Sequence, residues 1–195
     1  MKVFGLTGGA GMGKTTIAQF LAEHDARVVD TDLLAHQLVE PGEPALQEIA
    51  STFGSGIIAP DGRLRRAELA RMVFADASAR RQLEQIVHPR IRKVWEGQLE
   101  TWRSAGHPLA VVVIPLLFET RVEGHFDSIW CAACRPCSQQ QRLAARGWTV
   151  DHIVQRNAAQ LPIEQKMARS HQVIWTEGRL ECTGRQVELI LAKAK

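Results

Sequence analysis

The sequence predicts an α/β protein in which helices cover both faces of a five-stranded parallel sheet and a helical segment is inserted after the second strand. Short apolar runs alternate with stretches of helical periodicity, which is typical of parallel strands joined by crossover helices. One of these runs, PLAVVVIP, is apolar on both faces, as a central parallel strand must be. Residues 33 to about 105 contain no run with strand character, which predicts the insertion.

Five strands are expected along the chain. They are residues 2–6 (KVFGL), 26–30 (ARVVD), 108–115 (PLAVVVIP), 126–133 (FDSIWCAA) and 171–175 (HQVIW). A glycine-rich turn follows the first strand and leads into a helix. We expect this helix to run from Lys14 to about His24, because Ile17, Phe20 and Leu21 recur at helical spacing.

Four helical patterns fill the inserted segment. They are LLAHQLVE, EPALQEIASTFG, RRAELARMVFA and SARRQLEQIVH, with the turn-rich connector GSGIIAPDGRL between the second and the third. We expect the chain to turn back at His88 and Pro89, because the residue before a proline is disfavoured in helices. The predicted organisation is a core of residues 1–32 and 106–195, with a lid at about 136–150, and a helical lobe of residues 33–105.

Composition limits the classes of function. The chain has 195 residues, 45% hydrophobic and 23% charged, which is ordinary for a globular protein with one core and a small lobe. A formal net charge of +3 is too small to indicate nucleic acid as a partner. No apolar run has the roughly 18–20 residues of a membrane span, and MKVFGLTGG is too short for a signal peptide. We expect a cytoplasmic protein without nucleic-acid or membrane partners; no pattern indicates an oligomeric state.

The four cysteines raise the question of a metal site. Three of them form CAACRPC, a spacing that can ligate zinc or an iron–sulfur cluster. The alternative is a buried strand leaving the core, in which cysteine is a common small residue. No fourth ligand lies nearby in the order that a metal site requires, so we predict no bound metal. Disulfides are not expected in a cytosolic chain.

The glycine-rich turn GGAGMGKTT carries the clearest chemical signal. Gly8, Gly13, Lys14 and Thr15 fit the pattern G-x-x-x-x-G-K-[ST], between a strand and a helix as this phosphate-binding loop (P-loop) requires. Backbone N–H groups can approach phosphate closely where no Cβ intervenes, and the helix N-terminus favours anions. Lys14 is expected on the β- and γ-phosphates of a bound nucleotide, and Thr15 on Mg²⁺. The expected nucleotide-binding residues are Gly9, Ala10, Gly11, Met12, Gly13, Lys14, Thr15 and Thr16.

Two aspartates follow the second strand. Asp30 and Asp32 are two residues apart, so on a strand both would point the same way. Ligands of open α/β sheets bind at the carboxyl ends of the strands, where the P-loop also lies. The pair could orient an acceptor hydroxyl or a water bound to Mg²⁺. One of the two could instead cap the next helix.

Two arginines lie in the segment CSQQQRLAARG. Arg142 and Arg146 are four residues apart, on one face of an expected helix. An arginine pair on a helix is often only a solvated surface. Next to a P-loop it favours a lid over the triphosphate, because guanidinium groups match phosphate geometry and stabilise transition-state charge.

Together these segments resemble the dephospho-CoA kinase family over nearly the whole chain. GLTGGAGMGKTTIA is similar to the family's P-loop, and VVDTDLLAHQLVEPGEPAL to its D-A-D segment and following helix. Four further segments resemble the family: FGSGIIAPDGRLRRAEL with VF at 73–74, LEQIVHPRI, IPLLFE at 114–119, and QQRLAARG. The P-loop is common to many families, whereas the D-x-D, HP and PLLFE segments together are much more specific.

The resemblance implies an ATP-dependent kinase that phosphorylates the ribose 3′-hydroxyl of dephospho-CoA, giving coenzyme A and ADP in the last step of coenzyme A biosynthesis. It implies Asp32 as the catalytic base, beside Lys14 and Arg142, with Arg146 also on the nucleotide. It implies that the helical lobe binds the CoA moiety. The residues expected on the acceptor side are Asp30, Arg66, His88, Pro115, Leu116 and Glu119.

Some of these assignments have alternatives. Arg66 and His88 could equally be structural caps or salt-bridge partners, and Glu119 an ordinary carboxylate at a helix start. The segment SHQVIWTEG departs from the family's A-D-x-V-I-x-N-x-G, which lies near the adenine, and Thr31 replaces an alanine. Rival functions are another small-metabolite or nucleoside monophosphate kinase, and a nucleotide-hydrolysing switch that transfers nothing.

Overall fold

The computed structural model describes residues 1–194, which divide into two compact units. One unit comprises Met1–Asp30 and the chain from Thr101 onward, and it contains the sheet. The other comprises Thr31–Glu100 and is helical. The predicted boundaries, after residues 32 and 105, lie a few residues further along the chain than these.

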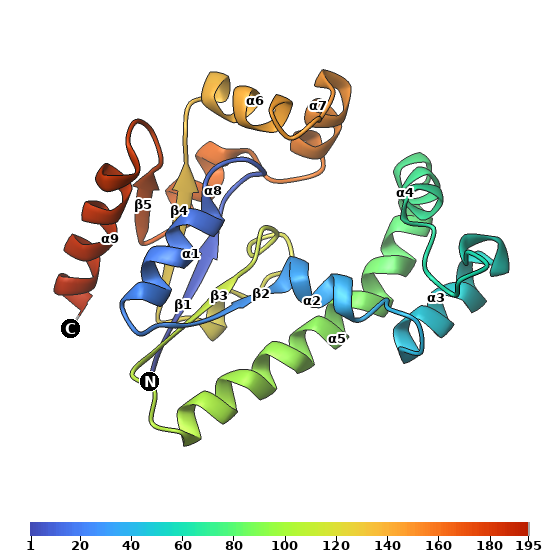
Figure 1. Ribbon diagram of the computed structural model, residues 1–195, viewed down its shortest axis with the longest axis horizontal. Helices are drawn as coiled ribbons and strands as arrows, with labels where there is room; N and C mark the ends of the chain where they lie inside the picture. The colour runs from blue at the N-terminus through green and yellow to red at the C-terminus, as the bar shows by residue number, and fades with distance from the viewer. Residues whose placement is uncertain (195) are drawn as a thin grey trace. The chain divides into compact units, whose positions relative to one another are not determined.

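Within the described residues the sheet has five strands, all parallel, in the order β2-β3-β1-β4-β5 (Figure 1). They are β1 (Lys2–Thr7), β2 (Arg27–Asp30), β3 (Leu109–Val113), β4 (Ser128–Ala133) and β5 (Gln172–Trp175). This confirms the predicted parallel sheet and its five strands. In a parallel sheet all carboxyl ends lie along one edge, so the turns that follow β1, β2 and β3 share that edge.

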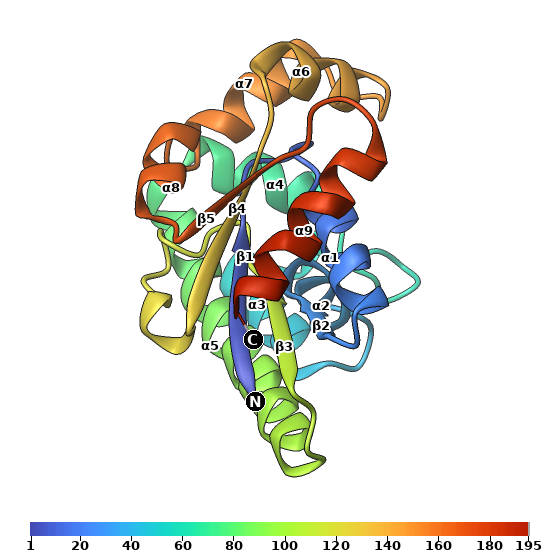
Figure 2. The same cartoon turned by 90° about the vertical axis from the view of Figure 1, so that its left-hand side faces the viewer.

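Alternation along the central strands assigns their side chains to two faces. Leu6 of β1 and Trp130 of β4 enter one core with Ile17 and Leu21 of α1 (Lys14–Glu23) and Val187 of α9 (Leu180–Ala194). Figure 2 shows α1 and α9 side by side on this face. Their neighbours in sequence, Thr7 and Cys131, therefore point to the opposite face.

Further helices of the sheet unit follow β4 along the chain. They are α6 (Pro136–Ala144), α7 (Val150–Ala158) and α8 (Ile163–Arg169), with a 3-10 turn, η2 (Glu123–His125), before β4. Lys166 of α8 contacts residues on the face of Thr7 and Cys131, so helices cover both faces as predicted (Figure 2). No helix within residues 1–194 is both long and apolar enough to cross a membrane.

The helical unit has its own core. Its elements are α2 (Thr31–Gln37), α3 (Pro44–Phe53), the 3-10 turn η1 (Ser55–Ile57), α4 (Arg66–Ala75) and α5 (Ala77–Ser104), of which the last four residues lie past the unit's boundary. The core residues are Val39, Leu46, Ile49, Ile57, Leu69 and Ile86. A single antiparallel bridge between Ile58 and Leu64 closes the predicted connector. The four predicted helical patterns are thus helices.

The predicted turn at His88 and Pro89 is wrong, because both residues lie inside the continuous helix α5. A proline inside a helix removes one hydrogen bond and costs about 3 kcal/mol. Burial of Ile86, Trp95 and Leu99 along α5 offsets this cost. Arg90, the next residue, donates from Nη1 to the Ile86 carbonyl at 2.6 Å and pairs with Glu48 of α3.

Candidate active site

The glycine-rich loop between β1 and α1 depends on its glycines for both conformation and space. Gly8 and Gly13 have φ angles of +139° and +87°, which residues with a Cβ rarely adopt. A Cβ on Gly8 would collide with the Ala132 carbonyl, and one on Gly13 would lie 2.7 Å from Cγ2 of Thr176. The loop is therefore held close to the carboxyl ends of β4 and β5.

Lys14 and Thr15 begin the helix that follows this loop. Lys14 Nζ donates to the carbonyls of Gly8 and Gly9, both at 2.9 Å, so its ammonium group lies over the loop. The N-cap residue, Gly13, has no side chain to satisfy the first N–H groups of α1, and the Thr15 side chain is exposed. Uncapped N–H groups, a cation and a hydroxyl are what a polyphosphate with a metal ion requires.

Helix α6 packs against this loop through a buried amide. Gln139 Nε2 donates to the Ala10 carbonyl at 2.8 Å, and the same amide pairs with the Asn157 side chain of α7. Neither residue was predicted as part of the site, because an isolated Gln or Asn in a polar helix carries no sequence signal. They connect α6 and α7 to the loop.

Arg142 of α6 also contacts the loop. Its Nη1 donates to Thr176 Oγ1 at 2.9 Å and to the Gly11 carbonyl at 3.4 Å, and its Nη2 donates to the Thr176 carbonyl. The Thr176 hydroxyl in turn lies 3.1 Å from the Met12 carbonyl. This threonine occupies the position where the family's segment has asparagine, so the substituted residue connects the loop to the lid.

Arg142 and Arg146 were predicted on one helix, but Arg146 lies just past the end of the helix that carries Arg142. Helix α6 ends at Ala144, and Arg146 lies in the turn that terminates it, exposed. Gly147, with φ of +81°, closes that turn, and the N–H of Trp148 returns to the Leu143 carbonyl. This Schellman-type ending, which glycine favours, overrides the four-residue spacing.

The two aspartates do not lie on one strand either. Strand β2 ends at Asp30, and helix α2 begins at Thr31, so Asp32 is in the first turn of a helix. The reason for expecting both side chains to point the same way therefore does not hold, since alternation with a period of two applies only to strands. Asp30 occupies the position before the helix, where the sequence allowed an N-cap. Asp32 is exposed in the helical unit.

Two other predicted residues lie in the helical unit. Arg66 begins α4 and lies 3.5 Å from Glu40 Oε1 and 3.4 Å from the His36 carbonyl. His88 is half-buried on α5, and burial lowers its pKa despite the opposing charge of Glu84. Their role in acceptor binding stays a prediction.

The lowered pKa of His88 predicts a pH effect on stability. Below its ordinary value of 6.5, the unfolded chain takes up a proton that the folded chain resists. The contribution of His88 therefore lowers the free energy of unfolding as pH falls below about 6.5. We expect the thermal midpoint to drop less between pH 7.5 and 5.5 in His88→Asn than in the unchanged protein; an equal or larger drop would contradict this assignment.

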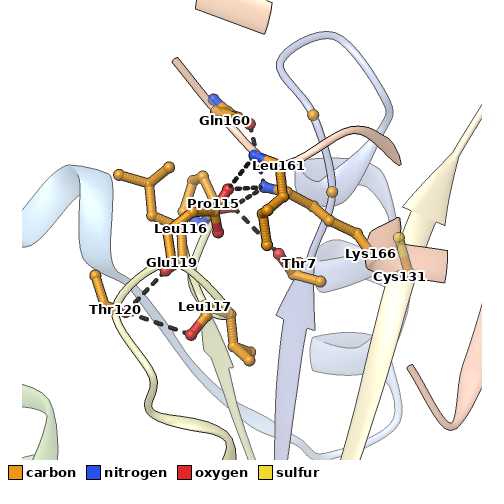
Figure 3. Close-up of polar contacts among 12 residues, drawn as sticks. Thr7, Pro115, Leu116, Leu117, Glu119, Thr120, Cys131, Gln160, Leu161 and Lys166 are labelled. Carbon is orange, nitrogen blue, oxygen red and sulfur yellow. Dashed lines mark hydrogen bonds and ion pairs between the residues drawn. The ribbon is translucent and has the colours of Figure 1, made fainter. Parts of the chain in front are cut away.

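The segment after β3 is organised around a buried lysine that the sequence did not reveal. Lys166 of α8 is 1% exposed; its Nζ lies 2.9 Å from Glu119 Oε1 and 2.6 Å from the Pro115 carbonyl (Figure 3). Glu119 Oε1 also accepts from the Leu161 N–H at 2.8 Å, whereas Oε2 is buried without a partner among the described residues. Nothing in IEQKMAR distinguishes Lys166 from a solvated helical lysine.

A cavity of about 340 Å³ lies between the loop and helices α6 to α8. Its wall includes Gly9, Met12, Cys134, Gln139, Lys166 and Trp175. It lies within the sheet unit, next to the P-loop. The wall is largely apolar with a few amide groups, as is usual for small-molecule pockets.

The cysteines separate into two groups. Cys131 and Cys134 are buried, and burial raises the pKa of both thiols, that of Cys131 to about 11. Cys137 and Cys182 are exposed. Among residues 1–194, no cluster of three or more His, Cys, Asp or Glu side chains could hold a metal ion. The prediction of no bound metal remains to be tested, by elemental analysis of the purified protein.

Comparison with known proteins identifies the family. The family model described as dephospho-CoA kinase matches residues 2–181. The chain belongs to the dephospho-CoA kinase family. The dephospho-CoA kinase of Geobacter sulfurreducens is 41% identical over 194 residues, covering 99% of this chain and 98% of that protein. The dephospho-CoA kinase of Symbiobacterium thermophilum is 40% identical over 190 residues, covering 96% of this chain and 79% of that protein.

Solved structures agree with this membership. The protein TT1252 from Thermus thermophilus has a TM-score of 0.84 and 32% identity, covering 100% of this chain and 98% of that one. A dephospho-CoA kinase from Campylobacter jejuni has a TM-score of 0.72 at 20% identity, which shows the shared fold. The predicted family and fold class are therefore confirmed: this dephospho-CoA kinase family member is a P-loop kinase.

Proposed function

We propose that the chain transfers the γ-phosphoryl group of ATP to the ribose 3′-hydroxyl of dephospho-CoA, giving coenzyme A and ADP. The observation that carries this proposal is the loop between β1 and α1, with Lys14 over its carbonyls, in a chain that matches the family over residues 2–181. Phosphoryl transfer depends mainly on positioning and on electrostatic stabilisation, which this loop can provide.

The proposed nucleotide site consists of the P-loop and the first turn of α1. Its N–H groups and the Lys14 ammonium bind the β- and γ-phosphates, and Arg146, exposed in the turn after α6, adds a second contact from the lid. Mg²⁺ prefers oxygen ligands and keeps several waters, and the exposed Thr15 hydroxyl fits this preference. Bound Mg²⁺ neutralises charge on the transferred group.

The proposed acceptor chemistry assigns a separate role to each aspartate. Asp32 orients the ribose 3′-hydroxyl and accepts its proton, and Asp30 supports the shell of the metal ion. The helical unit binds the CoA moiety, with Arg66 and His88 as its polar contacts. Pro115 and Leu116 form the wall beside the acceptor, and Glu119 supports that wall.

Arg142 is proposed to stabilise charge on the transferred phosphoryl group. Its Nη1 donates to the Gly11 carbonyl and the Thr176 hydroxyl, and its Nη2 donates to the Thr176 carbonyl, so the guanidinium fork holds the group beside the loop. We expect Arg142→Lys to lower kcat by about tenfold to a thousandfold, because lysine lacks the fork. Steady-state kinetics test this. A change confined to the KM for ATP would make Arg142 a residue of ground-state binding instead.

The proposed function is tested by measuring ADP release with and without acceptor. Dephospho-CoA should raise the rate strongly, whereas AMP and other nucleoside monophosphates should not. Stimulation by a nucleoside monophosphate instead would favour the rival kinase. Equal turnover without any acceptor would favour a hydrolytic switch.

A further inference from the structure

Lys166 is a buried cation whose hydrogen bonds all go to groups of two neighbouring segments. Besides Pro115 and Glu119, its Nζ lies 3.3 Å from Gln160 Oε1, in the turn before α8. These three acceptors match the three N–H bonds of an ammonium group. Two of them belong to the segment that follows β3, so Lys166 fixes that segment relative to α8 (Figure 3).

The Pro115 carbonyl links this cluster to the P-loop. It accepts a second hydrogen bond, at 3.2 Å, from Oγ1 of Thr7, which is fully buried. Thr7 is the last residue of β1, and the next residue, Gly8, is the first of the loop and accepts from Lys14. One carbonyl thus joins the start of the phosphate loop to the wall proposed for the acceptor.

Stability alone does not account for a buried ion pair at this place. Removing two charges from water has a desolvation cost, and well-packed apolar residues often replace buried pairs without loss of stability. The Lys166–Glu119 pair instead provides directed hydrogen bonds that fix a backbone carbonyl, which apolar side chains cannot do.

We infer that Lys166 is a positioning residue for phosphoryl transfer: its ammonium group bonds to protein acceptors, and through the Pro115 carbonyl it sets the acceptor wall relative to the P-loop. This rests on the proposed function. A displacement of about 1 Å can reduce a transfer rate by a hundredfold, so the role acts on kcat. Nucleotide binding depends on the loop itself and is expected to change little.

Two independent variants test this role. Lys166→Met leaves the Glu119 carboxylate without its cation, so it is combined with Glu119→Gln, which removes that charge. Thr7→Val removes the other hydrogen bond to the Pro115 carbonyl and keeps the side chain's shape. Glu119→Gln alone is the control for the carboxylate, and Lys193→Met is the control for loss of an exposed lysine of α9.

We expect the Lys166→Met/Glu119→Gln double variant to unfold at nearly the temperature of the unchanged protein but to have a kcat at least about tenfold lower, with KM for ATP within about threefold. Thr7→Val should show the same pattern as the double variant, a lower kcat with a nearly unchanged KM for ATP. Glu119→Gln alone should reduce kcat less than the double variant does, and Lys193→Met should not reduce it.

Two outcomes overturn the inference. In the first, both Thr7→Val and the double variant have a kcat and a thermal midpoint near those of the unchanged protein. The other is a loss in Glu119→Gln that equals the loss in the double variant. An unchanged protein without acceptor-dependent turnover would instead contradict the proposed function, so the two failures are distinguishable.

Discussion

Lys14→Ala is expected to lose most of the turnover while the fold persists. Lys14 Nζ donates to the Gly8 and Gly9 carbonyls, whereas the conformation of the loop is set by its glycines and by α6. The substitution therefore removes the cation proposed for the β- and γ-phosphates and leaves the scaffold. We expect kcat to fall by about a hundredfold or more, the usual scale for a lost transition-state donor.

The measurement is kcat with saturating ATP and dephospho-CoA, together with the thermal midpoint. Lys193→Ala is the matched control, because it removes an exposed lysine of α9 at the far end of the same unit's sequence. A Lys14→Ala protein with near-normal kcat would contradict the assignment of this loop to ATP phosphates.

Asp32→Asn is expected to bind nucleotide normally and to turn over roughly a hundredfold more slowly or worse. Asparagine keeps the size of the side chain and one oxygen, but it removes the charge and the site that accepts the proton. The scale is that of a positioned general base. ATP affinity should stay, because the P-loop is unchanged.

Asp30→Asn provides the comparison within the pair. Asp30 ends β2 at the sheet edge where the P-loop begins, and it is proposed to support the shell of the metal ion. Its loss should cost less kcat, and part of that loss should be relieved by raising Mg²⁺. Both variants are measured across a Mg²⁺ series. An inactive Asp30→Asn beside a nearly normal Asp32→Asn would reverse the roles assigned to the two aspartates.

The sheet could be predicted because its signal is local and repeated. In β3, Ala110 to Val113 are all at most 1% exposed, and such burial on both faces leaves a continuous apolar run in the sequence. The P-loop could be predicted for a similar reason, since glycines in constrained conformations cannot be exchanged for other residues.

The errors lie where one type of element changes into another. The period of two was extended through Asp32, although helix α2 had already begun at Thr31. The period of four was extended to Arg146, although α6 had already ended at Ala144. A proline is unfavourable inside a helix, as the prediction at Pro89 assumed, but the burial of apolar side chains along α5 outweighs this cost. Tertiary packing decides the position of Pro89, whereas the local boundary between two elements decides the other two positions.

Lys166 shows a different limit of the sequence. Its importance depends on acceptors that are 47 and 51 residues away along the chain, at Glu119 and Pro115. The spacing of residues within α8 does not indicate these partners. The buried amide between Gln139 and the Ala10 carbonyl is hidden in the same way, since 129 residues separate the two.

The central claim is that the chain phosphorylates the ribose 3′-hydroxyl of dephospho-CoA. The most direct measurement is the site of the new phosphate after incubation with ATP, Mg²⁺ and dephospho-CoA, determined by phosphorus NMR and by release with a 3′-specific nucleotidase. The account predicts one phosphate per acceptor, on the ribose 3′-oxygen, with one ADP formed. A phosphate at any other oxygen, or ADP and inorganic phosphate without a phosphorylated acceptor, would contradict it.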